Sequence, residues 1–464
     1  MQLTLQEIAQ MVRGRIFPPE ARATVRAIST DSRTLGRGDL YVPLRGEHFD
    51  GHDFLAAAVR QGAAACLSEE EIAGFPVPVI RVEDTLAALG DLAAGLRRRF
   101  AGPVAAITGS SGKTSTKEML GAILGQTGPG LKTAGNFNNL IGLPLTLFRL
   151  EPGHRWAVLE MGMSARREIA RLAEIAEPTV GVITNIGPAH LETLQSLEGV
   201  ARAKGELFAA LKSGATAVIN GDDEMVRQLP VANGVRRIVF GTSPEAQVRA
   251  EEVHVGAESV RFRLVLPQGG RPVHLPAAGR HNVANALAAA AAACALDIEP
   301  ALIVRGLESF RPATGRMEVI RLQGGGFLVE DSYNANPLSV RVALEALDEM
   351  GGGGRRIAVL GDMLELGSES AGFHREIGWI AARRSDFLVV LGKMAEHTAA
   401  GARERGMPPG RVRVVGGCDA AFDLLRKTVR PGDRVLVKGS RGMRMEQISE
   451  ALRVGDFPLA ANHG

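Results

Sequence analysis

Residues 104–124 read VAAITGSSGKTSTKEMLGAIL, and this stretch decides the class of fold. Val104 to Thr108 form a short apolar run of the kind that builds a buried strand, and KEMLGAIL, from Lys117 onward, has a helical pattern. Between the two lies a turn that contains Gly109 and Gly112. A strand, a glycine-bearing turn and a helix, in this order, are the context that a phosphate-binding loop requires.

The turn carries the residue types that bind nucleotide phosphates. Gly109 and Gly112 let successive N–H groups face one anion, and the N-terminus of the following helix adds its dipole. We expect Lys113 to reach the β- and γ-phosphates and the Thr114 hydroxyl to bind Mg²⁺. The match to GxxxxGK[ST] is imperfect, because Ile107 stands at the first glycine. The motif predicts nucleotide binding over a plain glycine turn, but it does not separate a switch, a transporter ATPase, a kinase and a ligase. The other candidate contacts of the loop are Ser110, Ser111 and Ser115.

Short apolar runs alternate with helical patterns on both sides of this loop. The first series contains VAAIT, WAVLEM, VGVITNI, ATAVIN and RIVFG, and a second begins near residue 317 with FLVED, RIAVLG, FLVVLG, RVRVVG and RVLVKG. Strands that alternate with helices predict mostly parallel, doubly wound sheets. We therefore expect a central doubly wound phosphate-loop ATPase sheet followed by a Rossmann-like C-terminal domain.

The first hundred residues have signals of their own. They contain an amphipathic opening helix (MQLTLQEIAQMVRGR), a turn-rich stretch over 29–53, a helix over 54–61 and a short strand, AAACLS. These signals predict a small N-terminal α/β domain. The expected domains are 1–100, 101–315 and 316–464, with AGP as a linker after the first and RPATGRME as a hinge before the third.

Composition excludes several classes of protein. The formal charge is only +3, from 54 basic and 51 acidic residues, which gives no electrostatic case for nucleic-acid binding. Cys66, Cys294 and Cys418 lie far apart and form no CxxC pair, which fits a reducing cytoplasm. The opening helix lacks the apolar core of a signal peptide, and the longest apolar run, residues 286–296, is too short to span a bilayer. We expect a soluble cytoplasmic monomer without membrane insertion.

Polar side chains follow two further strands of the first series. Glu160 ends WAVLE, and His190 lies in the loop after VGVITN. Ligands of doubly wound sheets gather outside the carboxyl ends of strands, so both side chains are predicted to face the phosphate loop. One carboxylate and a threonine hydroxyl suit Mg²⁺. Taken singly, Glu160 is equally typical of a surface acid, and His190 is more typical of a loop histidine than of a ligand; their joint position after strands of one sheet favours the site. Lys204, at the start of a helical run, reads from the sequence alone as an exposed lysine.

Ten longer segments carry a resemblance to a known family. They are STDSRTLGRGDLYVPLRGEHFDGHDF, TGSSGKTSTKEM, TAGNFNNLIGLPLT, LEMGMS, ITNIGPAHLE, AKGELF, GRHNVANALAA, EDSYNANP, VLGDMLELG and VKGSRGMRME. These segments resemble the Mur ligases, a family of ATP-dependent amide-bond ligases of bacterial cell-wall synthesis. The resemblance spans nearly the whole chain, and the family's loop has the shorter TGxxGK[ST] form, which accommodates Ile107.

The resemblance implies roles on the ATP side. Lys113 and the loop amides hold the phosphates, while Thr114 and Glu160 lie near one Mg²⁺. Lys204 corresponds to a lysine that the family carries as an N-carbamate (N6-carboxylated lysine), and with His190 it holds a second Mg²⁺. The other implied nucleotide contacts are Asn282, with Asn285, to the adenine, Arg316 to the phosphates and Asp331 to the ribose.

On the substrate side the resemblance implies three groups of contacts. Ser32 and Arg33, with DGHDF, resemble a uridine-nucleotide site, and Asn136, Asn138 and Asn139 resemble contacts to a muramoyl peptide, although three asparagines are also typical of a turn. The incoming dipeptide has one carboxylate, which favours Lys or Arg. Its implied contacts are Asn334, Asn336, Lys438, Ser440 and Arg441; solvated loops are the alternative for Lys438 and Arg441.

Two segments indicate which activity within the family to expect. DSYNANP and GDMLELG resemble the ligase that joins D-alanyl-D-alanine to UDP-N-acetylmuramoyl-tripeptide, and DNPR, expected of the diaminopimelate-adding ligase, is absent. The third residue of the tripeptide stays open. Competing hypotheses are another Mur-type ligase, a folylpolyglutamate-type ligase and a non-catalytic nucleotide-binding subunit. A dinucleotide oxidoreductase is disfavoured, because no GxGxxG opens either strand series.

Overall fold

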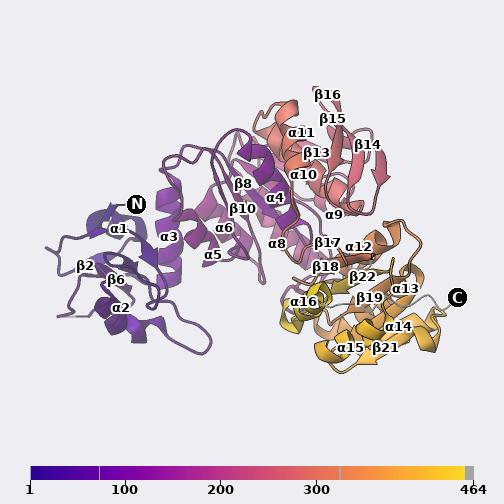
Figure 1. Cartoon of the computed structure of the whole chain (residues 1–464). Coiled ribbons are helices and arrows are strands. Elements are labelled where there is room, and N and C mark those ends of the chain that lie inside the picture. The colour runs from indigo at the N-terminus through magenta and orange to yellow at the C-terminus, as the bar shows by residue number, and fades with distance from the viewer. Residues whose placement is uncertain (1, 73, 323–324, 455–464) are drawn as a thin grey trace.

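The computed structural model describes residues 2–72, 74–322 and 325–454, and within them the strands form four sheets. Figure 1 shows three α/β parts that follow one another along the chain, which confirms the predicted fold class. Domain boundaries near residues 100 and 315 fall between the sheets, and we retain them as a proposal. Residues 1 and 455–464 of the proposed outer domains lie outside the described residues.

The N-terminal part contains a five-stranded sheet, ordered β2-β7-β6-β5-β4, and a two-stranded ribbon of β1 and β3. A capping box starts the opening helix, because Thr4 accepts from the Glu7 amide and Glu7 accepts from the Thr4 amide. The turn-rich stretch 29–53 contains one strand too short to predict, β5. The elements of the whole N-terminal part are β1 (Leu3–Thr4), α1 (Leu5–Val12), β2 (Arg15–Phe17), β3 (Thr24–Val25), β4 (Ile28–Ser29), β5 (Leu40–Tyr41), η1 (Gly51–Phe54), α2 (Leu55–Gln61), β6 (Ala65–Ser68), β7 (Val79–Arg81) and α3 (Thr85–Arg97).

The central part is built on a nine-stranded sheet ordered β16-β15-β14-β13-β12-β11-β8-β10-β9. The strands from β9 to β14 are parallel, and β15 and β16 extend the sheet in antiparallel fashion. Its elements are β8 (Val104–Thr108), α4 (Lys113–Gly125), β9 (Leu131–Lys132), α5 (Gly142–Leu147), β10 (Ala157–Glu160), α6 (Glu168–Ala176), β11 (Val180–Ile183), α7 (Leu191–Leu194), α8 (Leu197–Ala209), β12 (Thr216–Asn220), α9 (Glu224–Arg227), β13 (Arg236–Gly241), β14 (Val248–Val255), β15 (Val260–Leu266), β16 (Gly269–Leu275), α10 (His281–Ala295) and α11 (Pro300–Ser309).

Strand β8 explains why helices cover both faces of this sheet. Ala105 and Ile107 point into a core shared with α4, α10 and α11, whereas Val104 and Ala106 point into a second core shared with α5, α6 and α8. Side chains alternate along a strand, so a continuous apolar run buries both faces at once. Residues 286–295 of the alanine-rich run lie in α10 and pack against α4 and the sheet.

The C-terminal part contains a six-stranded sheet ordered β17-β18-β22-β19-β20-β21, in which only β17 is antiparallel to its neighbour. Every strand predicted for the second series is present. Its elements are β17 (Glu318–Arg321), β18 (Phe327–Asp331), α12 (Pro337–Glu349), β19 (Arg356–Leu360), η2 (Gly367–Glu369), α13 (Ser370–Arg384), β20 (Phe387–Leu391), α14 (Ala395–Glu404), η3 (Pro409–Arg411), β21 (Val412–Val415), α15 (Cys418–Thr428), β22 (Arg434–Lys438), η4 (Arg441–Met443) and α16 (Glu446–Val454).

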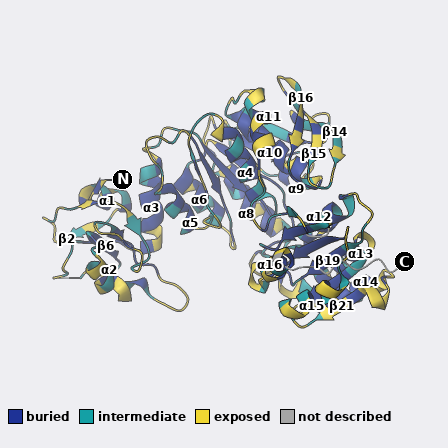
Figure 2. Cartoon of the chain, in the orientation of Figure 1, coloured by how far each residue is buried: buried dark blue, intermediate teal, exposed yellow. Residues whose placement is uncertain are grey.

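The registers of the two large sheets place polar side chains at strand ends. Glu160 pairs with Ile107 and Ile183 with Thr108, so β8, β10 and β11 finish at one edge. In the C-terminal sheet Asp331 and Lys438 occupy paired positions at the ends of β18 and β22. Figure 2 shows these strands buried and the outer helix faces exposed. Among the described helices none is long and apolar enough to cross a membrane.

Candidate active site

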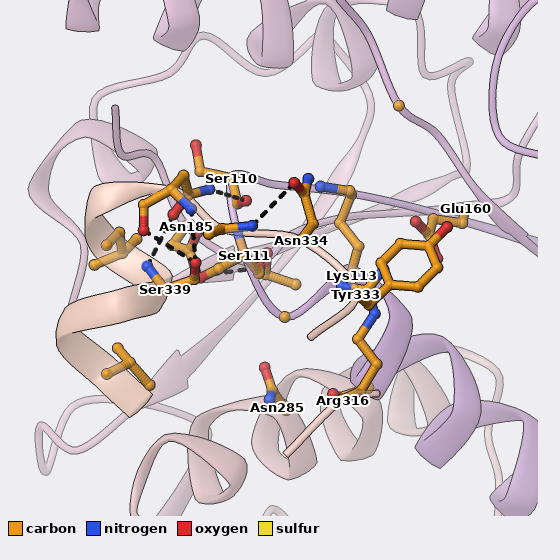
Figure 3. Close-up of a pocket in the computed structure, with 18 of the residues that line it drawn as sticks. Ser110, Ser111, Lys113, Glu160, Asn185, Asn285, Arg316, Tyr333, Asn334 and Ser339 are labelled. Atoms are coloured by element: carbon orange, nitrogen blue, oxygen red, sulfur yellow. Dashed lines mark hydrogen bonds between the residues drawn. The ribbon is translucent and has the colours of Figure 1, made fainter. Parts of the chain in front are cut away.

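A cleft of 670 Å³ lies where the central and C-terminal parts meet (Figure 3). The central part contributes the phosphate loop and the residues after β10, β11 and β12, and the C-terminal part contributes residues after β18 and β22. Lys113, Glu160, His190 and Lys204, which the sequence predicts to converge, all line this cleft. The expected juxtaposition of these side chains is therefore present.

The phosphate loop depends on its two glycines. Gly109 has φ 151° and Gly112 has φ 78°, a region of backbone space that favours glycine. A Cβ at Gly109 would lie 1.9 Å from Thr184 Oγ1, and one at Gly112 would lie 2.3 Å from Asn285 Oδ1. Asn185 fixes the loop from the next strand, because its side chain accepts from the Ser111 amide at 2.9 Å. The loop is thus preformed.

Lys113 begins α4 and reaches back across its own loop. Its Nζ donates to the Gly109 carbonyl at 2.6 Å. The enclosed position lowers the pKa of Lys113, the Glu160 carboxylate opposes that shift, and Arg316 adds to it. Because Lys113 lies near another cation, an anion that binds beside it stabilises its charged form, which fits a phosphate-binding role.

Glu160 is a buried carboxylate, 2% exposed, at the end of β10. Its Oε2 accepts from the Thr114 hydroxyl at 2.9 Å and its Oε1 accepts from Asn138 Nδ2 at 2.9 Å. Within residues 2–72, 74–322 and 325–454 it forms no ion pair, and no cluster of three or more His, Cys, Asp or Glu side chains could hold a metal. A buried anion beside a hydroxyl and the phosphate loop is a donor set that fits Mg²⁺ completed by nucleotide and water.

Lys204 lies in the middle of α8, not at the start of a helical run as the sequence reading had it. The side chain is 2% exposed, and its Nζ has no hydrogen-bond or ion-pair partner among the described residues. Burial holds the pKa of Lys204 well below its usual range, and Lys113 lowers it further. The exposed-lysine alternative is therefore wrong, since the amine is enclosed in the cleft.

The two asparagines after β16 have different positions. Asn285 lines the cleft, whereas Asn282 is buried behind it and accepts from Asn285 Nδ2 at 3.1 Å. Asn282 also donates to the Ala278 carbonyl at 2.7 Å. Its side chain therefore orients Asn285, which presents the polar group to the cleft.

Arginines gather around a tyrosine that the sequence reading did not single out. The Arg316 guanidinium lies 3.9 Å from the centre of the Tyr333 ring, and the Arg441 guanidinium lies 5.6 Å from it. All three residues line the cleft, and Figure 3 shows Arg316 reaching Tyr333. Tyr333 lies inside the DSYNANP motif, so its place between two predicted site residues was the signal that could have identified it.

The predicted C-terminal contacts divide into two groups. Lys438 lies 2.5 Å from Asp331 Oδ2, and Asn336 Nδ2 donates to the Ser110 carbonyl of the phosphate loop at 3.1 Å. Ser440 is buried outside the cleft lining, where it accepts from the Leu364 amide at 2.9 Å. The residues that line the cleft are Asp331, Asn334, Asn336, Lys438 and Arg441.

The remaining predicted contacts also differ in position. Asn136, Asn138 and Asn139 line the cleft, although Asn139 also caps the backbone amides of residues 141 and 142. Ser32 and Arg33 lie in the N-terminal part, outside this cleft, and Arg33 pairs with Asp31 at 2.8 Å. The structure therefore does not bring Ser32 and Arg33 into this cleft.

Three models of Mur ligase domains match the sequence. The "Mur ligase family, catalytic domain" covers residues 24–97, the "Mur ligase middle domain" residues 107–293, and the "Mur ligase, glutamate ligase domain" residues 315–441. A UDP-N-acetylmuramoyl-tripeptide–D-alanyl-D-alanine ligase of Escherichia coli is 38% identical, and one of Bacillus subtilis is 36% identical. Each alignment covers 97% of this chain and 98% of the relative.

Solved structures agree with these domain matches and relatives. A crystal structure of MurF from Acinetobacter baumannii is 34% identical with a TM-score of 0.90, over 98% of this chain and 99% of that one. MurF from Thermotoga maritima in complex with ADP is 30% identical with a TM-score of 0.83, over 92% and 97%. A folylpolyglutamate synthase of Mycobacterium tuberculosis, at 17% identity and a TM-score of 0.64, shares the fold alone.

The phosphate loop, the cleft and these similarities define an ATP-dependent, ADP-forming peptide ligase. The chain belongs to the Mur ligase family, and within it to the MurF group.

Proposed function

We propose that this chain joins D-alanyl-D-alanine to UDP-N-acetylmuramoyl-tripeptide, with cleavage of ATP to ADP and phosphate, in the synthesis of the peptidoglycan precursor. One observation carries the proposal. Lys113, Glu160, His190 and Lys204 of the central part line the same cleft as Lys438 and Arg441 of the C-terminal part. This arrangement brings the groups for phosphoryl transfer and the groups for an incoming amine into one enclosed space.

ATP occupies the side of the cleft formed by the phosphate loop. The amides of the loop and of the start of α4 face the phosphates. Lys113, which now donates to the Gly109 carbonyl, would donate to phosphate oxygens instead. Asn285 would contact the adenine, with Asn282 behind it, and Arg316 would contact the phosphates. Asp331 stays the candidate ribose contact.

Two Mg²⁺ ions fit the donors on the acidic side of the cleft. Thr114 and Glu160 would hold the first, and His190 with a carbamylated Lys204 would hold the second. When bound, Mg²⁺ neutralises the charge that develops on the transferred phosphoryl group. The amine of Lys204 is suited to carbamylation, because burial favours its neutral form, which adds to the carbon of CO₂ with release of one proton.

The reaction proceeds in two displacements. A carboxylate oxygen at the tripeptide's end attacks the γ-phosphorus, the bond from that phosphorus to the oxygen of ADP breaks, and an acyl phosphate forms. The amine of D-alanyl-D-alanine then attacks the acyl carbon, inorganic phosphate leaves, and the nitrogen loses a proton. Lys113 offsets the repulsion between the carboxylate and the triphosphate, which is the larger part of catalysis in such a transfer.

Arg441 is the best-placed cation for the carboxylate of the dipeptide. Lys438 is already neutralised by Asp331, whereas the Arg441 side chain is 65% exposed at the cleft and lies 3.5 Å from Glu446. An arginine binds a carboxylate with two parallel hydrogen bonds. Asn334 and Asn336 complete the dipeptide side, with Ser440 supporting the adjacent loop. Asn136, Asn138 and Asn139 are the candidate contacts of the muramoyl peptide, and Ser32 and Arg33 those of the uridine nucleotide.

We place this reaction in the cytoplasm and propose that the chain acts as a monomer. Support for the monomer comes from the cleft itself, since side chains of a single chain supply all the groups that the reaction needs.

Phosphate release from ATP tests the proposed function. Release should require both UDP-N-acetylmuramoyl-tripeptide and D-alanyl-D-alanine, and a ligated product should form in equal amount. Turnover that needs neither substrate, or that accepts a single amino acid or a folate equally well, would remove the assignment.

A further inference from the structure

A side-chain contact joins the C-terminal part to a predicted metal ligand of the central part. Glu365 lies in GDMLELG, between β19 and η2, and its Oε2 is 2.5 Å from Nδ1 of His190. The two residues are 175 positions apart in the sequence. No role proposed above for the nucleotide or for either substrate uses Glu365.

The loop that carries Glu365 is firmly held within its own domain. Ser440 Oγ accepts from the Leu364 amide at 2.9 Å, and His374 Nε2 accepts from the Met363 amide at 3.0 Å. The Asp362 carboxylate accepts from the amides before α14. Glu365 is therefore presented toward the central part by a rigid support, which suits a positioning role.

The backbone geometry is unusual on both sides of the contact. His190 has φ 54° and Glu365 has φ 63°, values in the left-handed region that non-glycine residues seldom adopt. The Glu192 amide also donates to the Glu365 carbonyl at 3.4 Å, so the two segments touch through their backbones as well. Residues held in such conformations by their surroundings concentrate at functional sites.

The chemistry of the contact indicates that Glu365 orients the His190 ring, and that it does little to hold the two domains together. The side chains of His190 and Glu365 are 29% and 59% exposed, and a side-chain contact of this exposure contributes little to holding two domains together. Since Nδ1 faces the carboxylate, Nε2 is the ring nitrogen left for a ligand. A histidine that binds a metal generally donates its other N–H to a carboxylate or carbonyl, which fixes its tautomer and ring orientation.

We propose that Glu365 is a positioning residue that accepts the Nδ1–H of His190 and presents Nε2 to the metal site shared with Lys204. The contact crosses from one domain to the other, so His190 is oriented only when the C-terminal domain lies against the central domain. Assembly of this metal site is thereby coupled to closure over both substrates. The inference rests on the proposed function, because it uses His190 as a metal ligand.

Mn²⁺ binding to the full chain with ADP tests this inference, with electron paramagnetic resonance as the readout. E365A should weaken one Mn²⁺ site by about 10- to 100-fold and leave the other unchanged. E365Q should lose less, because its amide oxygen still accepts from Nδ1. E192A is the matched control: it removes a carboxylate from the same contact region and should change neither site.

The variant H190A separates the two levels of the hypothesis. H190A should weaken the same Mn²⁺ site, and adding E365A to H190A should weaken it no further. If H190A loses the site while E365A retains full affinity, the role of Glu365 is overturned and the metal assignment stands. If H190A itself binds both Mn²⁺ ions normally, the metal assignment fails and the inference fails with it.

Discussion

Lys438 and Asp331 form a buried ion pair at the ends of neighbouring parallel strands, with 2.5 Å between Nζ and Oδ2. Lys438 also donates to the Asn334 carbonyl at 2.9 Å, and the Met317 amide donates to Asp331 at 3.2 Å. Burial lowers the pKa of Lys438 and raises that of Asp331, and each group opposes the shift that burial causes in the other. The pair fixes the start of the DSYNANP loop, which carries the proposed contacts to ATP and dipeptide.

Removing one partner of this pair should destabilise the chain more than removing both. K438M leaves a buried carboxylate without a cation, and we expect the free energy of unfolding to fall by about 3 kcal/mol. The double variant D331N/K438M should recover most of that loss, although ligase activity stays low in both. Denaturant unfolding measures the effect. Equal losses in the single and double variants would mean that the pair does not stabilise the domain as an ion pair.

Gly109 should tolerate no side chain. An added Cβ would lie 1.9 Å from Thr184 Oγ1, and its φ of 151° is strained for alanine. G109A should therefore lower the unfolding free energy by about 2 kcal/mol or more and abolish ADP binding. G125A is the control: Gly125 ends the same helix in open space, so alanine there should raise stability by about 0.5 kcal/mol. Calorimetric melting and ADP titration measure both variants.

The sequence predicts where strands end better than it predicts which side chains pack at those ends. Short apolar runs predicted the parallel strands, and the expectation that ligands gather at strand ends placed Glu160 and His190 in one cleft. Lys204 was not identifiable by pattern, because a lysine within a helix is normally exposed; only the resemblance pointed to it. Its burial depends on packing of α8, which no local pattern encodes.

Other parts of the structure were missed for identifiable reasons. Strand β14 and the antiparallel extension formed by β15 and β16 were not predicted, although β15 alternates buried and exposed residues. Glu365 had no signal beyond its motif, since its contact with His190 joins two residues that are 175 positions apart in the sequence. Ser440 and Asn282 were expected to touch ligands, whereas each hydrogen-bonds a neighbouring loop or side chain. A motif predicts which segment of the chain lies near the cleft, and hydrogen bonding decides which residues of that segment face it.

Lys204 should be essential through a carboxylate that it acquires. K204A should lower kcat by about 100-fold or more, because the proposed second Mg²⁺ loses a ligand. Short carboxylic acids such as acetate or formate should restore part of the activity by occupying the vacated space. K204R, which fills the space with a guanidinium that cannot form a carbamate at neutral pH, should resist rescue. A fully active K204A variant would exclude the carbamate.

His281 should make stability depend on pH. Burial, with Lys438 adding to it, lowers the pKa of His281 from 6.5 to about 4. The unfolded chain therefore binds a proton that the folded chain excludes, so stability falls as pH drops below about 6.5. Between about pH 7 and about pH 5 this group should remove at most about 2 kcal/mol. H281Q should have a shallower decline in chemical denaturation over this range, and a slope identical to that of the parent chain would contradict the pKa shift.

Variants of Asn336 should separate its effect on stability, through helix capping, from its effect on ATP affinity. Its side chain caps α12 by accepting from the Ser339 amide at 2.8 Å, and its Nδ2 donates to the phosphate loop at Ser110. N336A should lose both contacts, with about 1 kcal/mol of stability lost through the cap.

N336D keeps the cap but places a negative charge beside the loop that receives the triphosphate. ATP affinity should therefore fall by about tenfold or more, while the melting temperature stays near that of the parent. N336S, which caps but cannot reach Ser110, should retain stability and lose less affinity than N336D. If N336D bound ATP as tightly as the parent, the C-terminal domain would not lie against the nucleotide in solution as it lies against the loop here.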